Sequence, residues 1–347
     1  MSKNSEINCR LGKVGGQAVL EGVMMKSGEH VAVSVRREDG TIASDVSSFE
    51  SVRKKHKILN FPIIRGVVNF IEMLSLSMKT LNKSAELSGI AEGEEEGKFE
   101  KWLSKKFGKS VLDIAMGVAT VIGLALAIAL FFFLPNFLAT QLNKLVQVEV
   151  LESVFASIFK ISIFILYIYL VSLLKDIRRT FEYHGAEHKS IFCYENGDEL
   201  TVENVKRQRR FHPRCGTSFM FVMLIIGMLL SLGVRILVKY VIQFNIDNNI
   251  LRTLFYTGIG LLIILPLVVG TGYEFLMYAG KHDNIFVRVL SAPGLWMQRI
   301  TTREPNDSQI EVAIKSLKLA MPEVFPAEEE PAPEATEPEQ KEENEAD

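Results

Sequence analysis

Two histidines and a glutamate lie close together in the segment YHGAEHK, residues 183–189. His184 and His188 are four residues apart, so in a helix they would share one face and could bind one metal ion. Glu187 stands between them, which matches the H-x-x-E-H pattern of the inverted zincins, where two histidines hold zinc and the glutamate handles protons for the attacking water. The spacing predicts a zinc site with Glu187 as its catalytic residue, although such pairs also arise by chance on solvated helices.

Three further residues could complete such a site. His212 and Cys215 lie in the motif HPRC, and Glu274 lies in the last long apolar run. A catalytic zinc site needs three protein ligands and one open position, whereas a structural site uses four. The third ligand is therefore His212, Cys215 or Glu274. As plainer alternatives, His212 with Pro213 could form only a turn, and Glu274 could be an interfacial carboxylate.

Four apolar runs predict a mainly α membrane protein, since each can cross about 30 Å of hydrocarbon, which takes roughly 20 residues. They cover residues 111–134, 154–174, 216–234 and 254–278. Lysine and arginine number nine in 175–215 but one in 135–153. The positive-inside rule therefore predicts a multi-pass protein of the cell membrane, with both termini and the 175–215 segment in the cytoplasm. This topology brings the candidate ligands to one membrane level.

The chain before the first span predicts a small β-element and then an amphipathic helix. VAVSVRRE and TIASDVSSF flank Asp39-Gly40, a dipeptide favoured in tight hairpin turns. A Gly-rich segment and this β-hairpin occupy residues 1–60 in the prediction. Residues 61–110 hold an amphipathic helix, with apolar residues at helical spacing, followed by an acidic flexible linker.

The rest of the chain divides into a bundle, a cytoplasmic segment and a tail. The four-span bundle covers residues 111–282 and includes the cytoplasmic loop 175–215. Residues 283–325 hold a docking helix that Asp307 could cap. The tail, 326–347, carries ten acidic residues and one lysine and is predicted to be disordered.

The charge distribution indicates a membrane surface as the partner. Without its acidic tail the chain carries a net charge of +7, which suits an anionic lipid bilayer. The basic residues flank the predicted spans and do not form a stripe with aromatic residues, so nucleic acid is not an expected partner.

Several long motifs resemble one family. GGQAVLEGVMMK, RGVVNFIEM, YHGAEHKSI, LTVENV, HPRCGTSF and QRITTREPNDSQIEVAI are similar to the YqhQ-like family of bacterial integral membrane proteins, a family of unknown function with predicted metal-dependent activity. The resemblance covers nearly the whole chain, from about residue 11 to residue 319. It implies a membrane protein and a metal-dependent enzyme.

Two classes of function follow from these expectations. The first is a membrane-embedded zinc-dependent hydrolase that acts on a peptide or lipid-like substrate at the cytoplasmic interface. The second is a non-catalytic scaffold, assembly factor or metal sensor, in which a structural metal holds the cytoplasmic loop to the bundle. A membrane-protein partner or a homo-oligomer fits either class. The metal site depends on Gly185, since a helix that ended there would not bring His184 and His188 together.

Overall fold

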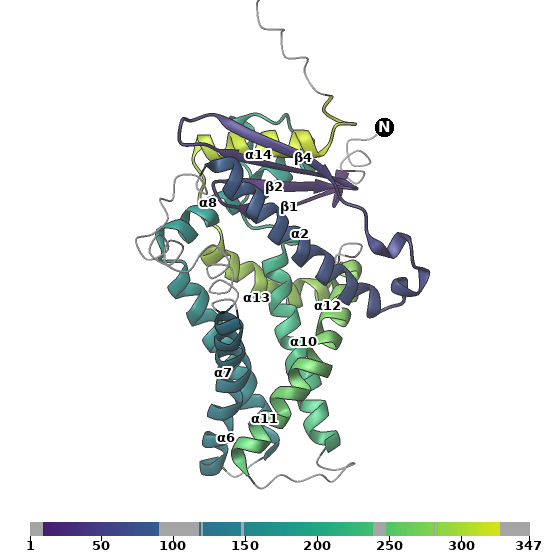
Figure 1. Cartoon of the computed structure of the whole chain (residues 1–347), viewed down its shortest axis with the longest axis vertical. Helices are drawn as coiled ribbons and strands as arrows, with labels where there is room; N and C mark the ends of the chain where they lie inside the picture. Colours follow the sequence, from purple (N-terminus) through teal and green to yellow (C-terminus); the bar gives the residue numbers. More distant parts are fainter. Residues whose placement is uncertain are drawn as a thin grey trace, which may run out of the picture.

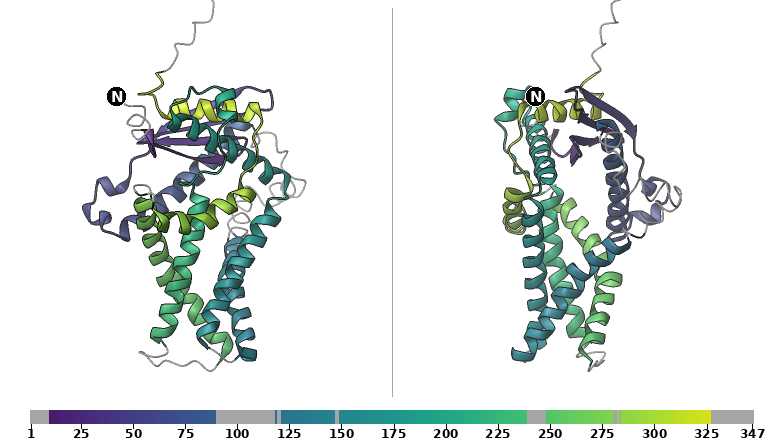
Figure 2. Two further views of the ribbon diagram at one scale, coloured as in Figure 1. Left: turned by 180° about the vertical axis from the view of Figure 1, so that it is seen from behind. Right: turned by 60° about the vertical axis from the view of Figure 1, so that its left-hand side comes forward.

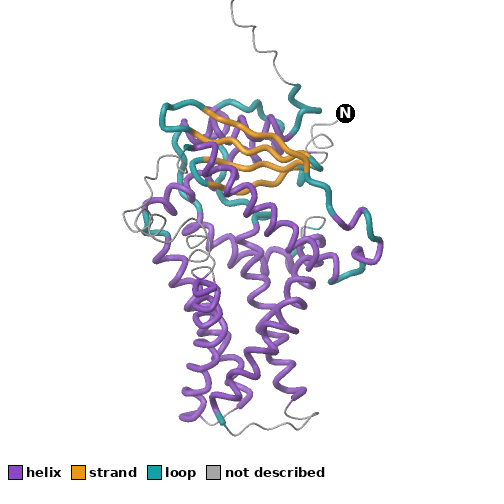
Figure 3. Tube along the Cα trace, viewed as in Figure 1, coloured by secondary structure: helices purple, strands orange, loops and turns teal. Residues whose placement is uncertain are grey.

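The computed structural model describes residues 10–89, 118, 121–146, 149–238, 248–279, 282 and 284–326. Long apolar helices form one end of the molecule, and a four-stranded sheet with helices on both faces forms the other (Figure 1). Figure 3 shows the strands gathered at this second end. The prediction of a mainly helical protein with a small N-terminal β-element is confirmed. The predicted acidic linker and the tail from residue 327 onward lie outside the described residues.

The sheet is an antiparallel meander of four consecutive strands. Its order is β1 (Val14–Val19), β2 (Gly22–Ser27), β3 (His30–Arg36) and β4 (Ile42–Ser48). The predicted hairpin is β3 with β4, and Gly40 in its turn has a φ of 85°, which favours glycine. β1 and β2 go beyond the prediction, because glycines within the two strands obscure the alternation of polar and apolar residues.

Helices cover both faces of the sheet (Figure 2). On one face, α8 (Lys175–Asn196) and α14 (Asp307–Ala320) pack against β1, β2 and β3 around a buried core that includes Met25, Ala186 and Leu317. On the other face lies α2 (Ile64–Ser88), the predicted amphipathic helix. Segments far apart in the sequence therefore build one compact unit beside the apolar helices, the sheet unit, which consists of the four strands with α2, α8 and α14.

The predicted docking helix is α14, with a different cap from the one expected. Asn306, and not Asp307, is the N-cap residue: its side chain accepts from the Gln309 N–H at 2.9 Å, and the Gln309 side chain accepts from the Asn306 N–H at 3.0 Å. This reciprocal pair is a capping box, in which both orphan backbone donors are satisfied. Asp307 instead occupies the first turn, where its charge suits the helix dipole.

Among the described residues, three helices are long and apolar enough to cross a membrane. They are Val121–Leu145, Val154–Val171 and Ile250–Ala279. The remaining predicted span, 216–234, lies in a helix whose apolar part, Phe219–Val234, is shorter than each of these three. The expectation of four spans is thus supported for three, and the fold is compatible with insertion into a membrane.

The first predicted span, 111–134, ends too early, because the helix continues beyond residue 134. Residues 111–117 lie outside the described part of the chain, and the helix continues past residue 134 to Val146. A π-turn, η3 (Ala129–Phe133), comes just before Pro135. Because a π-turn shifts the register of backbone hydrogen bonds, the missing N–H of the proline does not end the helix there.

The remaining elements connect these units. The predicted cytoplasmic loop 175–215 consists largely of α8 and the short α9, so it is an ordered helical segment. The other elements are η1 (Val52–Lys54), η2 (Lys57–Asn60), α6 (Leu134–Val146), α7 (Glu149–Val171), α9 (Val202–Lys206), α10 (Gly216–Ile236), α11 (Asn249–Ile259), the π-turn η5 (Gly260–Ile264), α12 (Leu265–Ala279) and α13 (Ile285–Thr301).

Candidate metal centre

Helix α8 runs without a break through Gly185, so it places His184 and His188 on one face, as the spacing predicts. The centroids of their rings lie 4.3 Å apart. Glycine is needed at 185 because a Cβ atom there would collide with the backbone oxygen of Arg303. The Arg303 N–H donates to the Phe181 oxygen at 2.8 Å, so the segment after α13 lies directly against α8.

Cys215 approaches the two histidines from a second element. It immediately precedes α10, and its carbonyl oxygen accepts from the Phe219 N–H at 3.3 Å, which makes it the N-cap residue. Its sulfur lies 3.3 Å from His184 Nε2. Within the described chain, one ligand atom from each of His184, His188 and Cys215 lies within 4.8 Å of the other two. The positive end of the α10 dipole also favours a negatively charged ligand at this position.

Backbone carbonyls determine which nitrogen of each histidine carries the proton. His184 Nδ1 lies 2.8 Å from the Thr301 oxygen, and His188 Nδ1 lies 2.5 Å from the Arg210 oxygen. A carbonyl oxygen only accepts, so each Nδ1 donates and each Nε2 keeps its lone pair. Histidines that bind metals usually have their second ring nitrogen held in this way. Both imidazoles are therefore already oriented as ligands.

The environment of His188 keeps its ring neutral. Burial lowers the pKa of His188, and the nearby His184 lowers it further, while Cys215 opposes both effects. His188 Nε2 is buried and has no hydrogen-bond partner among the described residues. A neutral imidazole with an unused lone pair is the form that binds a metal ion.

Glu187 lies beside this cluster and is only 4% exposed. Burial is the largest influence and raises the pKa of Glu187 to about 8, with His184 lowering it and Cys215 raising it. Its Oε2 atom has no hydrogen-bond partner in the described structure. Gly16 of β1 lies against the carboxyl group, since a Cβ atom there would come within 2.9 Å of Glu187 Oε1. A carboxyl group in such a place can accept and release a proton near neutral pH.

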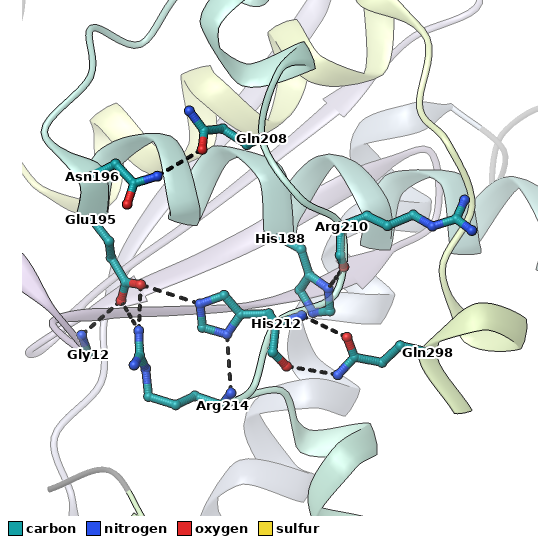
Figure 4. Close-up of polar contacts among 9 residues, drawn as sticks. All are labelled: Gly12, His188, Glu195, Asn196, Gln208, Arg210, His212, Arg214 and Gln298. Atoms are coloured by element: carbon teal, nitrogen blue, oxygen red, sulfur yellow. Dashed lines mark hydrogen bonds and ion pairs between the residues drawn. The ribbon is translucent and has the colours of Figure 1, made fainter. Parts of the chain in front are cut away.

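His212 lies near the cluster but is engaged elsewhere (Figure 4). Its Nδ1 accepts from the Arg214 N–H at 3.3 Å, and its Nε2 lies 3.4 Å from a carboxylate oxygen of Glu195. Its backbone exchanges two hydrogen bonds with the Gln298 side chain, at 2.7 and 2.8 Å. Both ring nitrogens therefore have partners, and His212 supports the neighbouring chain instead of offering a lone pair to the cluster.

Glu274 also lies apart from the histidines. Its carboxylate pairs with the Arg65 guanidinium, with Arg65 Nε at 2.6 Å from Oε1. The Ile63 N–H points to the same oxygen at 3.4 Å. Glu274 thus holds the N-terminal end of α2 against α12. The structure brings together three of the five predicted ligands, His184, His188 and Cys215, and places His212 and Glu274 in other contacts.

Several groups that contact the candidate ligands were not predicted from the sequence. The carbonyl oxygens of Thr301 and Arg210 leave no trace in a sequence, because every residue has one. Glu195 could have been found, since it follows His188 by seven residues and so shares its helix face. It accepts from the Gly12 N–H at 2.9 Å and from Arg214, which joins the start of the sheet unit to the Cys215 segment.

Comparison with known proteins shows the family to which the chain belongs. A family model described as "Protein of unknown function (DUF1385)" matches residues 61–323. The chain is 36% identical over 307 residues to a Bacillus subtilis (strain 168) protein named "Uncharacterized protein YqhQ", covering 87% of this chain and 90% of that protein. No solved structure shows a significant match. The chain therefore belongs to the DUF1385 family, and the matched region contains His184, His188 and Cys215 as well as the three long apolar helices.

Proposed function

We propose that this protein is a multi-pass membrane hydrolase with a zinc site at the cytoplasmic interface. One observation carries the proposal: three donor atoms from two separate elements converge within 4.8 Å, and both imidazoles present unprotonated nitrogens. Nitrogen and sulfur donors suit zinc among the common divalent metals. The bias of lysine and arginine supports the cytoplasmic placement.

The donor set favours catalysis over a purely structural role. His184, His188 and Cys215 provide three ligands, and a catalytic zinc site uses three protein ligands with one position left open. A zinc ion bound there would supply a Lewis acid for a carbonyl group and for water. The other two candidates for the third ligand, His212 and Glu274, are held in other contacts.

Glu187 is the proposed general base. Its carboxyl group is buried beside the ligands, and one oxygen lacks a hydrogen-bond partner among the described residues. In hydrolysis, Glu187 would take a proton from water as the water oxygen adds to the substrate carbonyl. It would then give that proton to the leaving group as the scissile bond breaks, so the proton count balances.

The substrate is proposed to be a peptide or a lipid-like ester that reaches the site from the membrane side. The site lies where α8 and the start of α10 meet, between the sheet unit and the apolar helices. A substrate at this level could leave the bilayer without crossing the sheet unit. The location of the site supports this part of the proposal.

The test is a hydrolysis screen of zinc-loaded protein in nanodiscs, using peptide and lipid-ester libraries. Glu187→Gln keeps the shape of the side chain but removes the base. We expect it to bind zinc normally and to lose about 10²- to 10⁴-fold in rate, the usual contribution of general base catalysis. The matched control is Glu199→Gln, a change at an exposed glutamate on the same cytoplasmic segment. Equal turnover by Glu187→Gln and wild type would refute the catalytic role.

A second function is a scaffold with a structural metal, and one observation favours it. The cluster joins α8 to α10, and the carbonyl of Thr301 ties α13 to it, so a metal there would also hold three elements together. X-ray absorption at the zinc edge separates the two functions. One sulfur, two nitrogens and one exchangeable oxygen support the hydrolase, whereas a fourth protein ligand supports the scaffold.

A further inference from the structure

A cavity of about 260 Å³ lies within the apolar end of the molecule, away from the candidate metal centre. Residues of α7, α10 and α12 form most of its wall, and Phe70 of α2 reaches it from the sheet unit. Methionines on successive turns of α10, at 220, 223 and 228, contribute flexible apolar side chains. Methionine is common at surfaces that adapt to apolar ligands. The volume is near the lower end of the range for ligand sites, so it suits a single chain.

The wall of the cavity also has a polar part. Ser157 and Lys160 of α7 and Ser231 of α10 line it, and a smaller cavity of about 30 Å³ that shares these residues adds Asn136 and Tyr256. Lys160 Nζ lies 5.1 Å from the centre of the Phe132 ring, a cation–π contact. The site therefore combines a long apolar wall with a cationic, hydroxyl-bearing part.

Lys160 lies midway along a helix that is apolar enough to cross a membrane. It is eleven residues from each end of α7, or about 16 Å at 1.5 Å per residue. Within the apolar span Val154–Val171 it lies six residues from the start. An ammonium group inside an apolar span is costly, and such residues mark binding sites or pathways as a rule.

Two π-turns border the same cavity. η3 contributes Phe132, and η5 contributes Gly260 and Ile264. The two turns face each other, because a Cβ atom at Gly260 would lie 3.8 Å from the Phe132 ring. π-turns are rare, and they occur frequently at functional sites. Two of them on one cavity are an observation independent of its lining chemistry.

We propose that this cavity binds a single-chain anionic amphiphile, with its hydrocarbon chain along the α10 methionines and its acidic group at Lys160. The apolar wall excludes a small polar ligand, and the lysine selects a negative charge over a neutral headgroup. Contact between the hydrocarbon chain and the apolar wall adds to the affinity, so the length of the chain matters as well as its charge. The acidic group is a carboxylate or a phosphate monoester. This site does not depend on the proposed hydrolase activity.

The experiment uses full-length protein in nanodiscs with a photoactivatable palmitic acid that carries a diazirine on its chain. Labelled peptides are mapped by mass spectrometry, and palmitate, hexadecyl phosphate and palmitate methyl ester compete. Gly227→Leu fills the cavity, since Gly227 lines it and a Cβ atom there already meets Val268 at 3.4 Å. Gly233→Leu is its control, because that glycine of α10 faces open space. Met228→Trp fills the same cavity if Gly227→Leu does not fold.

We expect saturable labelling on α10 that falls at least ten-fold in Gly227→Leu or Met228→Trp and persists in Gly233→Leu. Lys160→Met should weaken competition by palmitate about ten-fold without changing competition by the methyl ester, while Lys144→Met, at an exposed lysine of α6, should change neither. The better of the two anionic competitors identifies the acidic group. Unsaturable labelling, or equal labelling of the filled variants, would overturn the cavity assignment. Equal competition by acid and ester would overturn the role of Lys160.

Discussion

Replacing Gly185 by alanine should separate α8 from the segment that holds His184 in place. The added methyl group would collide with the Arg303 backbone oxygen and lie 3.3 Å from Pro305 Cδ. Relief requires the segment 301–305 to move away. That movement weakens the bond from the Arg303 N–H to Phe181 and shifts the Thr301 oxygen that binds His184 Nδ1.

The expected magnitude comes from opposing effects. Alanine favours a helix over glycine by about 1 kcal/mol. Overpacking costs about 1 to 3 kcal/mol, and a lost backbone hydrogen bond costs a further 0.5 to 1.5 kcal/mol or so. The substitution should therefore destabilise the fold by about 1 to 3 kcal/mol. Because the support of a ligating histidine is disturbed, zinc affinity should fall about 10-fold or more.

Two assays check this prediction on the purified protein in detergent. Thermal unfolding of the zinc-free protein measures stability, and competition with a chromophoric chelator measures zinc affinity. Gly233→Ala is the matched control, since this glycine also lies in a helix but an added Cβ atom meets nothing within 4 Å. It should be neutral or slightly stabilising. If Gly185→Ala is as stable as Gly233→Ala and binds zinc as wild type does, the close contact at Arg303 is not what positions His184.

Three further predictions follow. Folding raises the pKa of Glu187 from 4.5 to about 8. Between these two pH values the folded state keeps a proton that the unfolded state has released. The stability of the zinc-free protein should therefore fall as the pH rises from 4.5 to about 8. Glu187→Gln should therefore be more stable than wild type at pH 8, by up to about 4 kcal/mol, and equal to it at pH 4 in thermal unfolding; a constant difference across pH would contradict this. Cys215→Ser should keep the fold by circular dichroism but weaken zinc binding by two orders of magnitude or so, since it loses a thiolate ligand; unchanged affinity excludes Cys215 as a ligand. Arg65→Met should leave zinc content intact yet increase proteolysis of the start of α2, because it removes the partner of Glu274; loss of zinc in this variant would show that the Arg65–Glu274 pair supports the metal site.

Local patterns predict a good part of the fold. Asp39-Gly40 marks the turn between β3 and β4, and the apolar spacing in α2 marks its length. The strands β1 and β2 are harder, since glycine carries no side chain to show which face is buried. Gly16 shows why the position is nevertheless specific: Glu187 fills the space where a side chain would be. That requirement comes from a residue 171 positions away, so no local pattern contains it.

The approach of His184 to His188 could be predicted from the sequence, but the third residue of the cluster could not. The spacing of His184 and His188 requires only that the helix continue. The choice of third ligand depends on which side chains have other partners in three dimensions. His212 has Glu195 and the Arg214 backbone, and Glu274 has Arg65, whereas the Cys215 sulfur lies 3.3 Å from His184 Nε2. Such competition between partners is a tertiary property that sequence spacing does not express.

The most direct test of the metal site is zinc content by mass spectrometry on protein purified without chelator and with zinc supplied. Wild type, His212→Ala and Glu274→Gln should each hold close to one zinc per chain, because neither residue contributes a ligand. The double variant His184→Ala/His188→Ala should hold none. Zinc-free wild type, or a double variant that keeps its zinc, would contradict the site and with it the proposed hydrolase.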